Sequence, residues 1–476
     1  MKTILAYAFA VVVAGFLAWL VFHEPRRATE EDRGPDVTAG LPSDPMWYRR
    51  CDTEERLASA RFRLSRMTSS SVPAQQAGPM KDEIALLCLD EAVVDMIVSS
   101  FEAHPRLPTA ELSAYMEIFS RVRHAKFEPL LVRAVNHDDY EPQVNAVEAA
   151  RVQASARAVP FLDAALANAE RDLQMRVVRA LGAIGTASAV EVVRRHLPGL
   201  DRDAIILGIP ILAGANYREG IPVLERLLRH EDPDVEVLAA FSLARLGRGS
   251  GLDRLAAVVR DPARADGNRA QALQFHFELT GAKGIALDRE ILEGAGPLLA
   301  GEALCDLVRA GDATARERAR AALESLDAGE RSRACLALGR SADESDLRHV
   351  EERLDGMSGD EIKVFLTAVG VGRTPAGLAL LERLALRRDF IGDLAIKRFA
   401  DFGEVAVDPL IRSMDAEKET ERFAALARAL ASIPSPRARD HLASCAIPGN
   451  ARLEIYVRSG VQRQDLALLE VGRARN

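Results

Sequence analysis

Apolar residues recur at helical spacing along most of the chain, in similar segments that are separated by a fixed interval. The first series of segments starts at residues 127, 158, 189, 220 and 251, so the interval is 31 residues. Within each segment the apolar positions lie three or four residues apart, as one face of an α-helix requires. Three copies carry proline at the same place, where the first helical turn tolerates its missing N–H: Pro129, Pro160 and Pro222. The pattern predicts a repeated helical unit.

A second series with the same interval lies between these segments and starts at residues 144, 175, 206 and 237. Positions that differ by multiples of 31 form columns, and each column has a consistent chemistry. One column is mostly small, which lets neighbouring helices approach closely: Ala146, Val177, Gly208, Ala239, Ala270, Gly301 and Ser332. Another is mostly core-forming: Ala150, Leu181, Leu212, Leu243, Gln274, Cys305 and Leu336. The second series therefore predicts the partner helix of each repeat.

Polar residues mark the ends of the predicted partner helices. An acid precedes each of the first four copies, where a carboxylate complements the helix dipole and caps free N–H groups: Glu141, Asp172, Asp203 and Asp234. Residues that tolerate a left-handed backbone follow three copies: Gly185, Asn216 and Gly247. Continued at 31 residues, the same frame reaches the end of the chain. We predict an all-α, right-handed α-solenoid of about eleven helix pairs over residues 107–476.

The stretch EDPDVEVLAAFSLARLG (231–247), followed by GLDRLAAVV, resembles a HEAT repeat of the short bacterial type, often called phycobilisome-lyase-like. The resemblance covers roughly residues 95–470. It implies an armadillo-like stack of helix pairs with an extended binding surface. It is specific for fold and indicates little about function, because such repeats recur in scaffolds, adaptors and a few enzymes.

The N-terminal region has a different composition from the repeats. Residues 3–22 contain no charge and are long enough, at about 30 Å, to span a bilayer core. We predict an uncleaved single-pass transmembrane anchor rather than a removed signal peptide, since no small-residue cleavage site follows. Residues 23–45 are charged and rich in Pro and Gly, which predicts a linker. Residues 46–106 predict a helical cap on the open end of the solenoid, with helices at 46–67 and 80–103.

The charge pattern bears on location and partners. Arginines after residue 22 leave the positive-inside rule undecided, with a slight lean against export. The short stretch before the anchor resembles an export signal that was not cut, so we expect the body to be extracytoplasmic, in the periplasm. The net charge of −8 argues against nucleic-acid binding, which needs a concentrated basic surface.

The five cysteines divide into two groups. Cys305, Cys335 and Cys445 fall in apolar columns, which predicts small core residues. Cys51 and Cys88 lie outside the array and would form a disulfide if the body is exported. In a regular helical hairpin the two positions are offset by roughly 12 Å along the axis, so a bridge would need a staggered or broken helix.

Candidate chemistry is sparse. The histidines are scattered, and the best metal candidate, His230–Glu231, is a single pair, whereas the HEAT-like deoxyhypusine hydroxylases bind iron through several such pairs. His230 shares a column with turn residues, which favours a structural role. The glycine cluster LGRGSG (246–251) lacks the pattern of a phosphate-binding loop, and no C-x-x-C motif or acid–base pair stands out. We therefore expect no catalytic residue, no metal and no cofactor.

Charged columns on the first helix series remain as a candidate contact surface. Mixed charges there are typical of a solvated face, but these arginines could instead line the groove and bind an acidic peptide: Arg133, Arg195, Arg226 and Arg229. We predict a membrane-anchored scaffold that binds an unidentified protein or peptide. The alternatives are a bilin-lyase-like or other HEAT-fold enzyme, and a structural spacer of the cell envelope.

Overall fold

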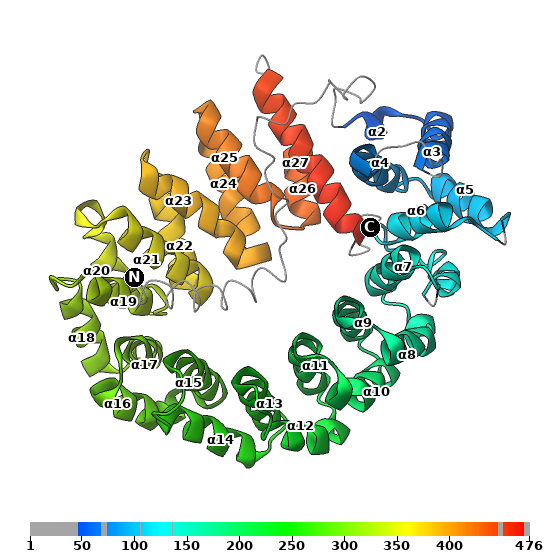
Figure 1. The fold of residues 1–476 in the computed structure, drawn as a ribbon. Coiled ribbons are helices and arrows are strands. Elements are labelled where there is room, and N and C mark those ends of the chain that lie inside the picture. Colours follow the sequence, from blue (N-terminus) through cyan, green and yellow to red (C-terminus); the bar gives the residue numbers. More distant parts are fainter. Residues whose placement is uncertain (1–45, 68–73, 105, 136, 446–450, 471–476) are drawn as a thin grey trace.

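Helices in two layers make up the protein. The computed structural model describes residues 46–67, 74–104, 106–135, 137–445 and 451–470, and within these ranges every regular element is a helix. Successive helices alternate between the layers, here named the A layer and the B layer, and follow one another around a ring (Figure 1). The predicted α-solenoid of paired helices is confirmed; its handedness stays a prediction.

The A layer carries the second helix series of the sequence. Its members are α4 (Ala74–Leu87), α6 (Thr109–Phe119), α7 (Tyr140–Gln153), α9 (Arg171–Ile184), α11 (Arg202–Gly214), α13 (Pro233–Arg245), α15 (Asp266–Thr280), α17 (Pro297–Arg309), α19 (Ala328–Gly339), α21 (Gly359–Gly372), α23 (Phe390–Arg398), α25 (Thr420–Ala431) and α27 (Ala451–Glu470). From α7 to α17 these helices lie on the inside of the ring (Figure 1).

The B layer carries the first series and is shorter. Its members are α3 (Thr53–Met67), α5 (Glu91–Glu102), η1 (Glu128–Arg133), α8 (Val159–Asn168), α10 (Ala187–His196), α12 (Ile221–Leu227), α14 (Gly249–Arg260), α16 (Ile285–Gly294), α18 (Ala313–Ala322), α20 (Glu344–Glu351), α22 (Pro375–Leu384), α24 (Val407–Ala416) and α26 (Pro436–Ser444). A one-turn helix, α2 (Trp47–Arg50), precedes them. The 3₁₀ turns are η2 (Ala156–Ala158), η3 (Leu197–Gly199), η4 (Arg218–Gly220), η5 (Gly281–Lys283), η6 (Leu354–Gly356) and η7 (Phe399–Ala406).

The repeat interval is confirmed, with one correction. A-layer helices start at residues 140, 171, 202 and 233, and again at 266, 297, 328, 359 and 390, so 31 holds on both sides of a single step of 33. The last two start at 420 and 451, and eleven pairs run from η1/α7 to α26/α27. The step of 33 shifts the predicted columns by two residues after residue 247. Ala272 is therefore fully buried, whereas Ala270, Gln274 and Ser332 of the predicted columns are only half-buried.

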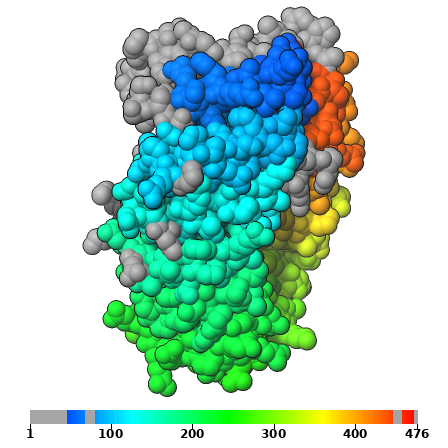
Figure 2. All heavy atoms as spheres, turned by 90° about the vertical axis from the view of Figure 1, so that its right-hand side faces the viewer, coloured from blue at the N-terminus to red at the C-terminus, as the bar shows by residue number. Residues whose placement is uncertain are grey.

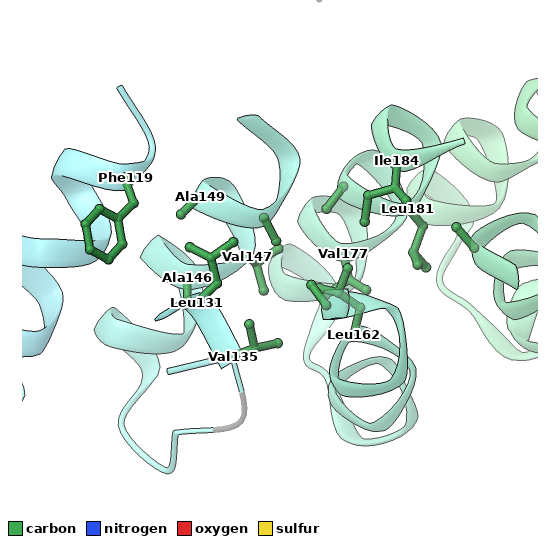
Figure 3. Packing of buried hydrophobic residues seen from close by; sticks show 14 of the residues in the cluster. Phe119, Leu131, Val135, Ala146, Val147, Ala149, Leu162, Val177, Leu181 and Ile184 are labelled. Carbon is green, nitrogen blue, oxygen red and sulfur yellow. The ribbon is translucent and has the colours of Figure 1, made fainter. Parts of the chain in front are cut away.

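The core lies between the two layers and continues from pair to pair. In Figure 3, Ala146 and Val147 of α7 face Val177 of α9, with Leu131 and Leu162 of the B layer beside them. All five are buried. Each pair thus hides its apolar face against its neighbours, which is how a solenoid is stabilised without a single central core.

The predicted helix ends are confirmed. Pro129, Pro160 and Pro222 lie in the first turn of their helices. Gly185, Asn216 and Gly247 have φ of 63°, 51° and 80°, the left-handed conformation that ends a helix. The acids Glu141, Asp172, Asp203 and Asp234 lie in the first turns of A-layer helices, although at α13 the cap itself is Asp232, which accepts hydrogen bonds from the N–H groups of Asp234 and Val235.

The two ends of the array meet, so the ring is closed. Each A-layer helix packs on the next, and the last, α27, packs on α4. Figure 2 shows the orange-to-red C-terminal residues directly beside the blue N-terminal ones. Residues 46–106 therefore do more than cover an open end, as the sequence predicted, because they also form the surface on which the C-terminal helix packs. The predicted helix at 80–103 is divided into α4 and α5, and Asp90 caps α5 through the N–H of Ala92.

The predicted anchor and linker, residues 3–22 and 23–45, lie outside the described residues. Among the helices that are described, none is both long and apolar enough to cross a membrane.

Candidate interaction surface

The concave face of the ring is best defined along α11, α13 and α15. Each of these A-layer helices packs against its A-layer neighbours on two flanks, and against B-layer helices on the outside of the ring. The one side left exposed therefore faces the middle of the ring. Along α13, exposed and half-exposed positions recur at Leu238, Phe241 and Arg245, which form a single stripe at helical spacing.

An apolar patch crosses this face, and we name it the aromatic patch. It consists of Leu207 and Pro210 on α11, Leu238 and Phe241 on α13, and Phe275 on α15. The rings of Phe241 and Phe275 stack with their centroids 4.3 Å apart. Leu207, Leu238 and Phe275 also pack against buried core residues, so one side of the patch is anchored and the other is exposed. Exposed aromatic residues on a firm base are typical of binding surfaces.

The sequence did not indicate this patch. Phe241 and Phe275 are 34 residues apart, so a constant frame of 31 assigns them to different columns. The step of 33 between α13 and α15 brings them into contact. A search for aromatic residues at non-core positions of the A-layer helices is the signal that could have found them.

Cations border the aromatic patch. The Arg245 guanidinium lies 5.8 Å from the Phe241 ring centre, a cation–π arrangement. Arg179 is exposed on α9, whose neighbour α11 carries one end of the patch. Arginine side chains next to exposed aromatic rings favour a partner segment that combines apolar and acidic side chains.

Polar contacts between neighbouring repeats line the N-terminal ends of the A-layer helices. The Tyr140 hydroxyl donates to Asp172 at 2.7 Å, and Arg171 donates to Asp203 at 2.5 Å. Arg202 continues the series by donating to Asp234. These contacts hold the pKa of Asp203 below its usual range, chiefly through the hydrogen bond from Arg171. Exposed pairs of this kind add little stability, but they favour one register between repeats.

The four predicted contact arginines lie on the B-layer side of the array. Arg195 donates to Asp163 of the preceding repeat at 3.2 Å. Arg133 donates to the carbonyl of His104 at 2.8 Å, and its guanidinium lies 4.2 Å from the Phe101 ring centre. Arg226 and Arg229 are exposed at the end of α12. Because α10 and α12 are on the outside of the ring (Figure 1), these arginines belong to the convex face and do not line the groove. Their role in partner binding stays a prediction.

Two buried carboxyl groups were also missed by the sequence. Asp288 on α16 and Asp306 on α17 have no exposed surface, and their helices pack together. Burial, with a smaller effect of Glu302, raises the pKa of Asp288 to about 7. The same two influences raise the pKa of Asp306 well above its usual range. Since neither side chain is accessible to solvent, the pair cannot touch a substrate in this conformation.

The other predicted residues have structural surroundings. Cys305 and Cys335 are fully buried, which confirms the core prediction, and Cys445 is half-buried. Cys51 and Cys88 are not bonded to each other in the structure: Cys88 is buried, while the Cys51 thiol donates to the carbonyl of Trp47 at 3.4 Å.

His230 lies in the turn before α13, as its column predicted. Its Nδ1 accepts a hydrogen bond from the N–H of Asp232 at 3.0 Å. His137 makes the same contact with Asp139 three repeats earlier. Within the described ranges, no group of three His, Cys, Asp or Glu side chains is arranged to hold a metal ion.

Comparison with solved structures finds three kinds of similar chain. Human deoxyhypusine hydroxylase in complex with glycerol is 15% identical, with a TM-score of 0.24 over 59% of this chain and 94% of that one. An engineered protein is 17% identical, with a TM-score of 0.23 over 87% and 99% of the two chains. Kap121p bound to Pho4p is 10% identical, with a TM-score of 0.39 over 88% of this chain and 54% of its own.

These likenesses are too low to indicate a common function. No family model matches the sequence, and no curated protein matches it. The assignment as a closed array of helix pairs therefore comes from the geometry of this chain.

Proposed function

We propose that the protein is a ring-shaped scaffold that binds a segment of another protein on its concave face. The observation that supports this most directly is the aromatic patch, where Phe241 and Phe275 stack at 4.3 Å and remain partly exposed. Burial of such rings would release apolar surface from water at roughly 25 cal/mol per Å². The bordering Arg179 and Arg245 favour a partner segment that carries acidic residues beside apolar ones.

In this proposal residues 3–22 anchor the scaffold in a membrane, and the ring lies on the extracytoplasmic side. The protein acts by binding and not by catalysis. The burial of Asp288 and Asp306 is consistent with that role, because the most perturbed carboxyl groups have no access to a substrate.

Site-specific photo-crosslinking in intact cells tests the proposal. A benzophenone side chain replaces Phe241 on the concave face, and in a matched control it replaces Arg226 on the convex face. We expect a defined protein adduct at position 241 that is reduced at least severalfold by the second change Phe275→Glu. No adduct at position 241, or an equal adduct at position 226, would refute the concave face as the contact.

Charge reversal tests the convex alternative separately. If the arginines on the B-layer side bind the partner, Arg226→Glu combined with Arg229→Glu should abolish the adduct. If the aromatic patch binds it, the adduct should persist.

A further inference from the structure

The place where the ring closes differs from every other junction of the described A layer. We name it the closing junction: it joins α27 to α2, α4 and the turn after α6. Elsewhere, a B-layer helix links neighbouring A-layer helices and packs on them, as α14 packs on both α13 and α15. Separation there would strip a covalently attached helix from its packing. At the closing junction the two sides are more than 400 residues apart in the chain, so separation leaves the chain connections between neighbouring helices intact.

The apolar part of the closing junction is small. Leu469 is buried within the N-terminal core cluster, and Leu466 packs against the same cluster. From the other side, Met46 packs against the C-terminal core cluster. The N–H of Arg123 donates to the carbonyl of Leu469 at 3.0 Å, which fixes the last turn of α27 against the N-terminal region.

The polar part converges on one carboxylate. Asp465 has no exposed surface and accepts hydrogen bonds from the Tyr48 hydroxyl and from Arg49, whose Nε and Nη2 lie 2.9 and 2.7 Å from its two oxygens. Tyr48 is also buried, and burial together with the adjacent Asp465 raises its pKa, so it remains a donor. Arg151 adds an exposed ion pair to Glu470 at 3.0 Å.

This composition makes the closing junction weaker than its neighbours. Desolvation of a buried ion pair offsets most of its attraction, so the pair adds little net stability to the closed state. In the open state water can solvate Asp465 and Arg49. Loss of one partner has a much larger effect, because the other charge then remains buried without compensation.

We propose that the ring opens and closes at this junction, and that Asp465 with Tyr48 and Arg49 holds it closed. The inference deepens the proposed function and rests on it, because opening would admit an internal segment of a partner polypeptide sideways to the concave face. A permanently closed ring would admit such a segment only end-first.

Distance measurements between spin labels test the proposal in the full chain. One label pair replaces Glu54 on α3 and Arg463 on α27, both exposed and on opposite sides of the closing junction. A matched control pair replaces Arg179 on α9 and Arg245 on α13, within the continuous array. Cys51 and Cys445 are changed to Ser to prevent their labelling. The perturbation is Asp465→Lys, which places a second cation beside Arg49; Asp465→Asn is a milder companion.

We expect a minor population of long distances for the 54–463 pair, and an increase in the open-to-closed ratio on the order of a hundredfold in Asp465→Lys. The control pair should not change, and circular dichroism should show the helices intact. An unchanged 54–463 distribution in Asp465→Lys would overturn the proposal. Equal broadening in the control pair would overturn it too, because the array would then loosen everywhere. No partner is used, so this test can fail while crosslinking at position 241 succeeds, and the reverse.

Discussion

Replacement of Asp288 by Asn should stabilise the protein at pH 8 and have almost no effect at pH 5. Asp288 has no exposed surface, and neither carboxyl oxygen has a hydrogen-bond partner among the described residues. Burial raises its pKa from the ordinary 3.8 to about 7. The folded state therefore holds this proton more tightly than the unfolded state does.

The sign of the pH dependence follows from that difference. Below pH 4 the carboxyl group is neutral in both states and costs nothing. Between pH 4 and pH 7 the unfolded state loses the proton first, so stability decreases as the pH rises. Above pH 7 the full cost is present, about 4 kcal/mol from the two pKa values at 1.36 kcal/mol per unit. Asparagine is neutral throughout but keeps two buried polar atoms, so the expected gain at pH 8 is about 1–3 kcal/mol.

Urea unfolding at pH 5 and pH 8 measures the effect, with hydrogen exchange of α15, α16 and α17 to localise it. Asp253→Asn, at an exposed position of α14, is the matched control and should change stability little at either pH. Equal stability differences between Asp288→Asn and the parent at both pH values would refute the reasoning. A less stable variant at pH 8 would refute it as well.

Three further predictions concern packing, caps and helix ends. Gly251→Ala should lower stability by about 1–3 kcal/mol, because the added Cβ would overlap the backbone of α13, whereas Gly249→Ala has open space and should not; thermal unfolding compares them. Gln153→Ala should cost about 1–3 kcal/mol and speed hydrogen exchange at the end of α6, since the Gln153 amide donates to the carbonyls of Phe119 and Val122 at 2.7 and 2.6 Å. Asp232→Ala should cost about 1 kcal/mol by removing the cap of α13, and an unchanged urea midpoint would contradict this.

The repeat was predictable because the same local chemistry recurs in each copy. Prolines in first turns, left-handed residues at helix ends and turn residues such as His230 all act within a few residues of their own position. The structure confirms them for that reason. Even Gln464 is equivalent to Gln153: each lies 13 residues after the start of its helix and donates to two carbonyls of the preceding A-layer helix.

The predicted contact surface was less predictable. The sequence showed that arginines share columns, but a column does not reveal which layer faces inward. Arg195 and Arg226 belong to helices on the outside of the ring, because the longer A-layer helices occupy its inside (Figure 1). The aromatic patch was missed because a two-residue step in the repeat brings Phe241 to Phe275.

By itself, the sequence determined that helices form, where they begin and end, and that each packs on the next, since these properties depend on residues close together in the chain. Only the tertiary structure decided that the array closes. Closure depends on small rotations that accumulate over many repeats, and on contacts such as Tyr48 with Asp465, 417 residues apart. No periodic pattern encodes that meeting, because it involves the two ends of the array and occurs once.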